Sequence, residues 1–177
     1  MSPVNRTPYL TMDLTFTLAG SRDAPTLVAL RTAAARALTA RFGDGPWSTE
    51  PSERGVLGDF RTADVWVAKN GSGIVATFRL ATRKPWAIDT GYFTACRRPL
   101  YLTNMAVHPD VQRRGVGRLC LVHADEVARR RSADAIRLDA YDAEAGAGTF
   151  YSRCGFREVG PSAHGELPLI CYEWLVL

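Results

Sequence analysis

The sequence predicts one α/β (α+β) domain built around a single mixed sheet, and two observations support this prediction. Segments with the two-residue alternation of β-strands take turns with segments of helical spacing, and a pair of strand patterns lies toward each end of the chain. The chain has 177 residues, of which 46% are hydrophobic and 23% charged. That size and composition suit one globular domain spanning residues 1–177.

The first half of the chain is expected to contain a strand, a helix and a β-hairpin. Residues 11–18 alternate polar and apolar side chains, as a half-buried strand does. Ser21 or Asp23 is placed to cap a helix that has Pro25 in its first turn and ends near Gly43. The expected elements are a strand at 11–18, a helix to about 41, a loop at 43–53, a helical turn at 56–61, and hairpin strands at 65–68 and 74–80 joined by a glycine-rich turn.

The second half alternates strands and helices after an unpatterned segment at 82–98. A helix is expected at 143–154 even though it contains Gly146 and Gly148. Each glycine costs about 1 kcal/mol relative to alanine within a helix, so this helix should be frayed or closely approached by another group. The other expected elements are strands at 99–107, 136–141, 156–159 and 167–177, and a helix at 115–131.

Composition excludes several classes of protein. No stretch approaches about 20 consecutive apolar residues, and residues 1–11 lack the apolar core of a secretory signal, so we expect a cytoplasmic protein without a membrane span. Lys and Arg number 22 against 18 Asp and Glu, with no block of five like charges, so nucleic-acid binding is not indicated. The four cysteines contain no C-x-x-C pair and the three histidines have no matching spacing, which predicts free thiols and no metal site.

The segment that indicates chemistry follows the strand at 99–107. His108-Pro109-Asp110 breaks the strand, and Gly115 and Gly117 then open a helix. Glycines let backbone N–H groups crowd around an anion, and the helix N-terminus adds unpaired donors and partial positive charge. A pyrophosphate suits this arrangement. The third glycine of a dinucleotide-binding motif is replaced by Cys120, and no lysine completes a P-loop, so both of those nucleotide sites are excluded.

The same segment resembles the GNAT superfamily of acetyl-CoA-dependent N-acetyltransferases. Residues 112–117, Gln-Arg-Arg-Gly-Val-Gly, match the family motif Q/R-x-x-G-x-G/A, and residues 105–109 look like the end of its fourth strand. Residues 147–156 are similar to the family's A-x-x-x-Y-x-x-x-G-F element. The resemblance covers about residues 100–159. It implies a mostly antiparallel sheet of about seven strands, flanked by helices and splayed between strands 4 and 5.

The resemblance also implies roles for individual residues around acetyl-CoA, which would be the co-substrate. The backbone of Met105, Ala106 and Val107 would hold the pantetheine arm, and the Val107 N–H would face the thioester oxygen. Tyr151 would protonate the departing thiolate, since a phenol with a pKa of about 10 stays protonated at pH 7. The residues expected to hold the pyrophosphate are Gln112, Arg113, Arg114, Gly115, Val116, Gly117 and Arg118.

Two departures from the family pattern bear on the mechanism. Glu144 stands where many relatives have an asparagine that contacts pantetheine. Many relatives also have an acidic general base on the fourth strand, where this chain has Tyr101, Thr103 and Asn104. A relay of the amine proton is then needed, through a water held by Asn104, Asp89 or Asp139.

The acceptor is expected to be an amine of a small molecule or peptide that reacts by direct attack in a ternary complex. Substrate contact is assigned to the unpatterned segment, at Trp86, Asp89, Tyr92 and Phe93, because three aromatic residues there are unusual for a bare linker. Two alternatives stay open: a CoA-binding regulatory or interaction module without useful turnover, and an acetyltransferase acting on aminoacyl-tRNA or protein. Many relatives dimerise through C-terminal strands, so a homodimer is also open.

Overall fold

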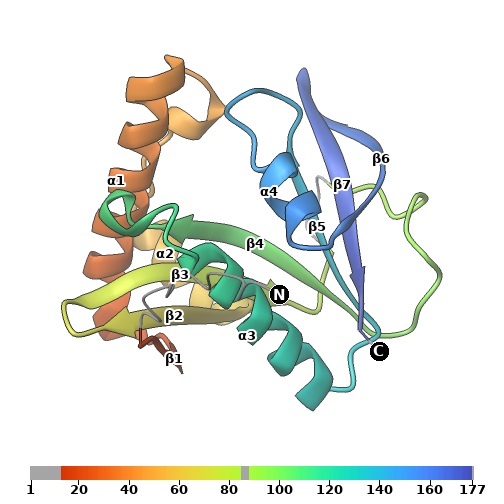
Figure 1. Ribbon diagram of the computed structural model, residues 1–177, viewed down its shortest axis with the longest axis horizontal. Coiled ribbons are helices and arrows are strands. Elements are labelled where there is room, and N and C mark those ends of the chain that lie inside the picture. The colour runs from red at the N-terminus through yellow and green to blue at the C-terminus, as the bar shows by residue number, and fades with distance from the viewer. Residues whose placement is uncertain (1–12, 85–87, 177) are drawn as a thin grey trace, which may run out of the picture.

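The computed structural model describes residues 13–84 and 88–176, which form a seven-stranded sheet flanked by helices (Figure 1). The strand order is β1-β2-β3-β4-β5-β7-β6, with β4 and β5 parallel and the other neighbouring pairs antiparallel. This mixed sheet confirms the predicted fold class. The strands are β1 (Thr15–Leu18), β2 (Asp64–Asn70), β3 (Gly73–Ala81), β4 (Pro99–Val107), β5 (Ala135–Tyr141), β6 (Arg157–His164) and β7 (Leu167–Leu175).

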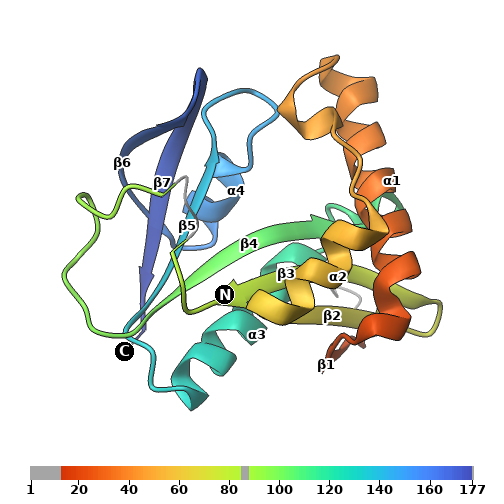
Figure 2. The same cartoon turned by 180° about the vertical axis from the view of Figure 1, so that it is seen from behind.

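The helices cover the two faces of the sheet. Figure 1 shows α3 and α4 in front of the sheet, and Figure 2 shows α2 in front of β2 and β3 on the opposite face. Within the part of the chain that the structure describes, none of the helices is long and apolar enough to cross a membrane. The helices are α1 (Ala24–Phe42), α2 (Glu53–Thr62), α3 (Val116–Arg130) and α4 (Gly148–Arg153), with short 3-10 turns η1 (Ser21–Asp23), η2 (Pro46–Ser48) and η3 (Pro109–Val111).

The predicted helix at 143–154 is wrong over its first half, because α4 begins only at Gly148. A side chain at Gly146 would collide with the carbonyl oxygen of Tyr141, and one at Gly148 would collide with the hydroxyl of Tyr172. Both glycines therefore permit close approach of the backbone to the sheet, as their cost in a helix indicated. The helix found in place of the predicted turn at 56–61 is longer and spans Glu53–Thr62. It begins earlier because the Ser52 hydroxyl accepts a hydrogen bond from the Gly55 N–H and caps α2.

The core is divided by the sheet. On the α3 and α4 face, Phe78, Leu80 and Ile136 pack with side chains of both helices. On the other face, α1 and α2 pack Leu27 and Val56 against β2. The remaining part of that face is covered by the β3–β4 connection rather than by a helix, through a small apolar cluster of Ile88, Phe93, Tyr101 and Cys171.

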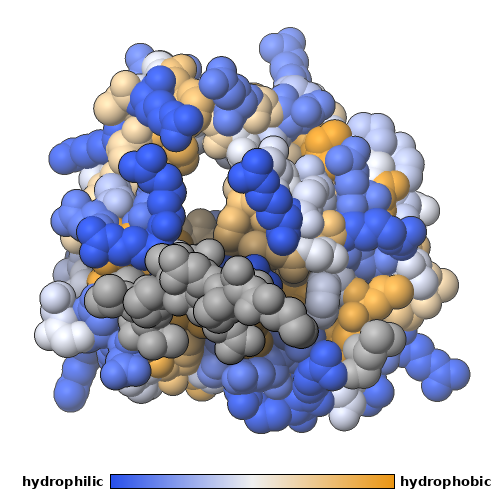
Figure 3. Space-filling model, in the orientation of Figure 1, coloured by the Kyte–Doolittle hydropathy of each residue, from blue (hydrophilic) through white to orange (hydrophobic). Residues whose placement is uncertain are grey.

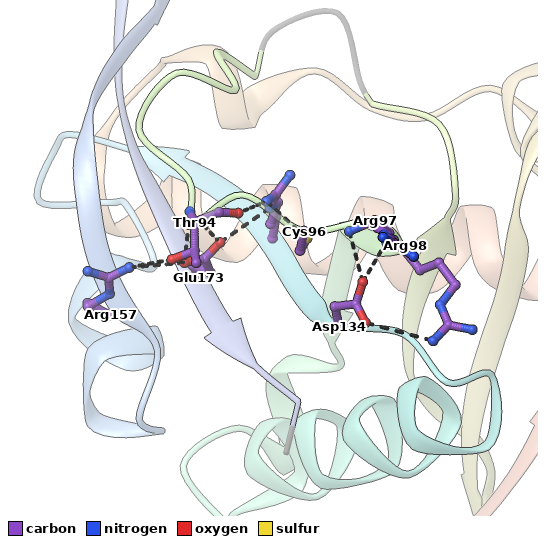
Figure 4. A network of polar contacts seen from close by, with 8 residues as sticks. Thr94, Cys96, Arg97, Arg98, Asp134, Arg157 and Glu173 are labelled. Atoms are coloured by element: carbon purple, nitrogen blue, oxygen red, sulfur yellow. Dashed lines mark hydrogen bonds and ion pairs between the residues drawn. The ribbon is translucent and has the colours of Figure 1, made fainter.

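The fully buried carboxylate of Glu173 fixes the β3–β4 connection to the sheet. It accepts hydrogen bonds from the backbone N–H of Thr94 at 3.1 Å and from its hydroxyl at 2.7 Å. Arg137 on β5 and Arg157 on β6 contact the same carboxylate at 3.3 and 3.0 Å. Figure 4 shows Thr94 and Arg157 directed at Glu173. Arg137 also lies over the ring of Phe93, 4.7 Å from its centroid. Residues 88–94 of this connection are therefore packed against the sheet.

Candidate active site

Strands β4 and β5 pair only over their first residues and then diverge. Their parallel pairing ends at Tyr101 and Arg137, so beyond this point β4 has an edge that β5 does not cover. A cavity of about 470 Å³ opens between the diverging strands, and Figure 3 shows a gap through the molecule between the α1 side and the α4 side. Its lining includes Asn104 and Met105 of β4, Asp139 of β5 and Tyr151 of α4.

A β-bulge in β4 lies at this opening. Thr103 pairs with Arg79 and Ala106 with Thr77, so two residues of β4 face the single residue Phe78 of β3. Asn104, the first of the two, has a φ of 51°. Its amide Nδ2 donates to a carboxylate oxygen of Asp59 on α2 at 3.2 Å.

The last peptide groups of β4 face the open edge. The His108 N–H donates to the carbonyl oxygen of Val75 on β3 at 2.8 Å. Because consecutive residues of a strand direct their peptide groups to opposite edges, those of Val107 face away from β3. The side-chain Nε2 of Gln112 donates to the Val107 carbonyl oxygen at 3.0 Å on that side. The Val107 N–H is thereby directed at the opening, near the start of the glycine-containing turn.

That turn has the backbone geometry of an anion cradle. Gly115 takes a φ of 85° and caps α3, and Arg113 has a φ of 59°. The first N–H groups of a helix have no partner within it and carry partial positive charge. Gly117 lets α3 approach α4 closely, since a Cβ there would lie 3.0 Å from the Phe150 ring. Arg113, Arg114 and Arg118 are exposed around the turn.

Tyr151 lies inside the site rather than on the surface of α4. Its side chain is buried and its hydroxyl lies 3.8 Å from the sulfur of Met105, the second residue of the bulge. Burial, and to a smaller extent the negative charge of Asp139, raises the pKa of Tyr151. The phenol is therefore held in its protonated form throughout the neutral range.

Asp139 is the carboxylate that lines the cavity together with Tyr151. Burial raises the pKa of Asp139, while hydrogen bonding by its own backbone and the charge of His164 act in the opposite direction. Of the three residues predicted to hold a relay water, Asn104 lines the same cavity as Asp139, with its amide Nδ2 bonded to Asp59. Asp89 lies elsewhere, exposed in the β3–β4 connection, where it accepts a hydrogen bond from the Gly91 N–H.

A second cavity of about 460 Å³ lies between α1, α2 and β4 and also reaches Asn104 and Met105. Trp47 of η2 lines both cavities. Its ring packs edge-on against Tyr141 at the end of β5, with 6.3 Å between the ring centroids, so it bridges the two sides of the opening. The indole N–H donates to the Gly43 carbonyl oxygen at 3.0 Å, which fixes its orientation.

Comparison with known protein families shows which family this domain belongs to. A family model described as an acetyltransferase (GNAT) domain matches residues 61–158, more than half of the chain, including β4, the glycine turn and Tyr151. The chain belongs to the GNAT acetyltransferase family. A comparison with curated proteins gives no match.

Solved structures share the GNAT fold at low sequence identity. A GNAT-family acetyltransferase from Listeria monocytogenes is 16% identical with a TM-score of 0.75, covering 97% of this chain and 99% of its own. The ribosomal-protein-S18-alanine N-acetyltransferase from Escherichia coli is 18% identical with a TM-score of 0.67, covering 93% and 94%. The Salmonella typhimurium protein yncA, solved with its cofactor acetyl-CoA, is 15% identical with a TM-score of 0.65, covering 93% and 94%.

Not every residue expected to act in this GNAT domain lies at the opening. Tyr92 is 45% exposed with its ring against Gly160, and Phe93 is buried beneath Arg137. Neither residue, nor Asp89, lines the two cavities. Trp86 lies outside the described residues, and Glu144 is exposed. The predicted substrate contact of this segment stays a prediction. Trp47, which lines both cavities, and Asp59, which lines the second, were not among the expected residues.

Proposed function

We propose that this GNAT domain is an N-acetyltransferase that transfers an acetyl group from acetyl-CoA to a primary amine by direct attack in a ternary complex. The observation that carries the proposal is the pairing of Asp139 and Tyr151 in one cavity beside the open edge of β4. One group has the chemistry of a base and the other that of an acid, and their surroundings favour these roles.

The residues that would hold acetyl-CoA fit that molecule. Gly115 has open space around it at the N-terminus of α3, where a pyrophosphate would lie, with three exposed arginines nearby. The open edge of β4 can pair with the amide groups of pantetheine as a further strand would. Acetyl-CoA would supply the acetyl group as a thioester. The Val107 N–H, directed at the opening, would donate to the oxygen that gains negative charge.

The side chains of the cavity provide for the proton transfers. A primary ammonium with a pKa of about 10.4 must lose a proton before attack, which costs about 4–5 kcal/mol at pH 7. The Asp139 carboxylate would accept this proton, and its raised pKa makes it a stronger base than an exposed aspartate. Tyr151 would donate its proton to the leaving sulfur and regain one from Asp139 or solvent.

The part of the opening that would receive the acetyl acceptor suits a small group with several hydrogen-bond donors. Because Nδ2 of Asn104 donates to Asp59, the Oδ1 of Asn104 is the end that can accept a hydrogen bond from a substrate. Asp139 likewise presents acceptor atoms only, which favours an ammonium. The bridge between Trp47 and Tyr141 limits access to a small molecule or the end of a flexible chain. Asp139 supplies the carboxylate that β4 lacks, so the absence of an acidic residue on β4 does not favour a non-catalytic CoA-binding module.

Turnover measured with a panel of primary amines tests the proposal. We expect release of free CoA thiol with at least one amine, and a Tyr151→Phe variant with kcat reduced about 10²–10⁴-fold at nearly unchanged acetyl-CoA affinity. Phenylalanine keeps the buried ring, so stability should change little. Binding of acetyl-CoA without transfer to any amine would favour the regulatory module. A preference for tRNA or protein as the acceptor, with a rate that falls steeply with salt, would favour the second alternative, an acetyltransferase acting on aminoacyl-tRNA or protein.

A further inference from the structure

The Asp59 carboxylate on α2 joins four elements behind the site. It accepts from Nη1 of Arg31 on α1 at 2.8 Å and from Nδ2 of Asn104 on β4 at 3.2 Å, and Nε of Arg79 on β3 lies 3.6 Å away. Arg79 in turn donates to the hydroxyl of Thr103, the residue before Asn104, at 3.2 Å. We call Arg31, Asp59, Arg79 and Asn104 the Asp59 cluster.

The arginines of this cluster serve Asp59 rather than a ligand. Nε and Nη2 of Arg31 and Nε of Arg79 are buried and have no hydrogen-bond partner among the described residues. Arg31 lines the second cavity, but these nitrogen atoms are themselves buried, so a hydrogen-bond acceptor in that cavity does not reach them. The two guanidinium groups hold the carboxylate in place from two sides. The remaining contact of Asp59, to Asn104, is the one that leads into the active site.

Asn104 needs such a contact because of its backbone. Its φ of 51° lies in the left-handed region, which is unfavourable for a residue with a Cβ, although asparagine tolerates it better than most. This conformation forms the bulge that sets the register between β3 and the last residues of β4. A relaxed Asn104 would shift Met105 and Val107 relative to β3 and turn their peptide groups away from the opening.

We infer that Asp59 is a positioning residue: it holds Asn104 in the left-handed conformation, so that the peptide groups of Met105 and Val107 face acetyl-CoA. The inference rests on the proposed function, because it assigns the acetyl-CoA contact to these peptide groups. It differs from a purely structural role in one measurable respect. Asp59 should matter only while residue 104 has a Cβ that makes the positive φ unfavourable.

Acetyl-CoA affinity, measured by calorimetry, tests this in four variants; kcat is not the readout, because the Asn104 side chain also faces the acceptor. Asn104→Ala should weaken acetyl-CoA binding about tenfold, because alanine is strained at this φ, whereas Asn104→Gly should stay within about threefold of the wild type. Asp59→Asn should weaken binding about tenfold on its own but less than about twofold when added to Asn104→Gly. Thermal unfolding verifies that each variant is folded.

Equal affinities of Asn104→Ala and Asn104→Gly would overturn the inference, and so would an equal effect of Asp59→Asn in both backgrounds. If Asp59→Asn fails to fold on its own but folds when added to Asn104→Gly, the inference is supported, and failure to fold in both backgrounds would overturn it. A wild type that binds acetyl-CoA but acetylates no amine counts against the proposed function alone, since the affinity contrast remains measurable. A wild type that does not bind acetyl-CoA overturns both.

Discussion

The imidazole of His123 lies flat against the ring of Phe16, with 4.4 Å between the ring centroids and 8° between the planes. Trp66 packs edge-on against the same imidazole at 4.7 Å. Nδ1 of His123 lies 3.4 Å from Glu126, while Nε2 is buried without a partner among the described residues. Burial lowers the pKa of His123, the charge of Glu126 opposes this shift, and Arg130 adds to it. The folded protein therefore favours the neutral ring.

This lowered pKa predicts acid-sensitive stability. Between the folded and unfolded pKa values of His123, the unfolded chain binds more protons than the folded one. The contribution of His123 to the free energy of unfolding is therefore fully present above about pH 6.5 and decreases as the pH falls below this value. A His123→Phe variant keeps a flat ring on Phe16 but cannot titrate. Urea unfolding from pH 8 to pH 5 should show the wild type losing more stability than the variant. Parallel curves would contradict the prediction, since all carboxylates are common to both proteins.

The contacts of Glu173 predict that removal of its carboxylate greatly lowers the stability of the fold. Glu173→Ala leaves Arg137 buried without a counter-charge and frees the Thr94 N–H. Breaking a buried ion pair costs about 3–5 kcal/mol, which corresponds to a Tm lower by on the order of 10 °C in a domain of this size. Arg36→Gln removes an ion pair whose two side chains are 71% and 46% exposed and should leave Tm unchanged. A similar Tm for both variants would mean that Glu173 does not hold the β3–β4 connection.

The glycine turn predicts a site-specific effect on ligand stabilisation. Acetyl-CoA at about 100 times its Kd should raise Tm by roughly 5–10 °C. The double variant Gly115→Glu/Gly117→Glu should lose this rise, because it adds negative charge at the pyrophosphate and a side chain against Phe150. Gly71→Glu adds one such charge at a hairpin turn with open space around it and should keep the rise. A rise retained by a folded double variant would place acetyl-CoA elsewhere.

Local patterns predicted those parts of the site that are contiguous in the chain. The strand at 99–107, the turn at 112–117 and Tyr151 lie within one stretch of sequence, and β4 has the predicted bounds. Asp59 and Trp47 could not be predicted, because only the packing of α2 and η2 across the sheet brings them to Asn104 and the opening. The position of the β3–β4 connection could not be predicted either, because its sequence has no periodicity. Its position depends on Glu173, which lies 79 residues after Thr94 in the chain.

Asp139 predicts a change in the pH dependence of the reaction. The sequence indicated it only as one of three candidates, since the burial that raises its pKa exists only in the folded domain. Asp139→Asn keeps the side-chain shape but cannot accept the ammonium proton, so we expect kcat at pH 7 to fall about 10²–10⁴-fold.

The pH dependence of the rate distinguishes loss of the general base from general damage to the site. The wild-type rate should rise through a carboxylate pKa above the ordinary aspartate value and then level off, because burial raises the pKa of Asp139. The rate of Asp139→Asn should not show this rise and plateau. It should keep increasing up to the pKa of the amine, because only the amine already deprotonated in solution can react. Asp44→Asn, at an exposed loop position, should retain the wild-type profile. If Asp139→Asn lowers the rate equally at every pH, Asp139 orients the acceptor and the proton leaves by another path.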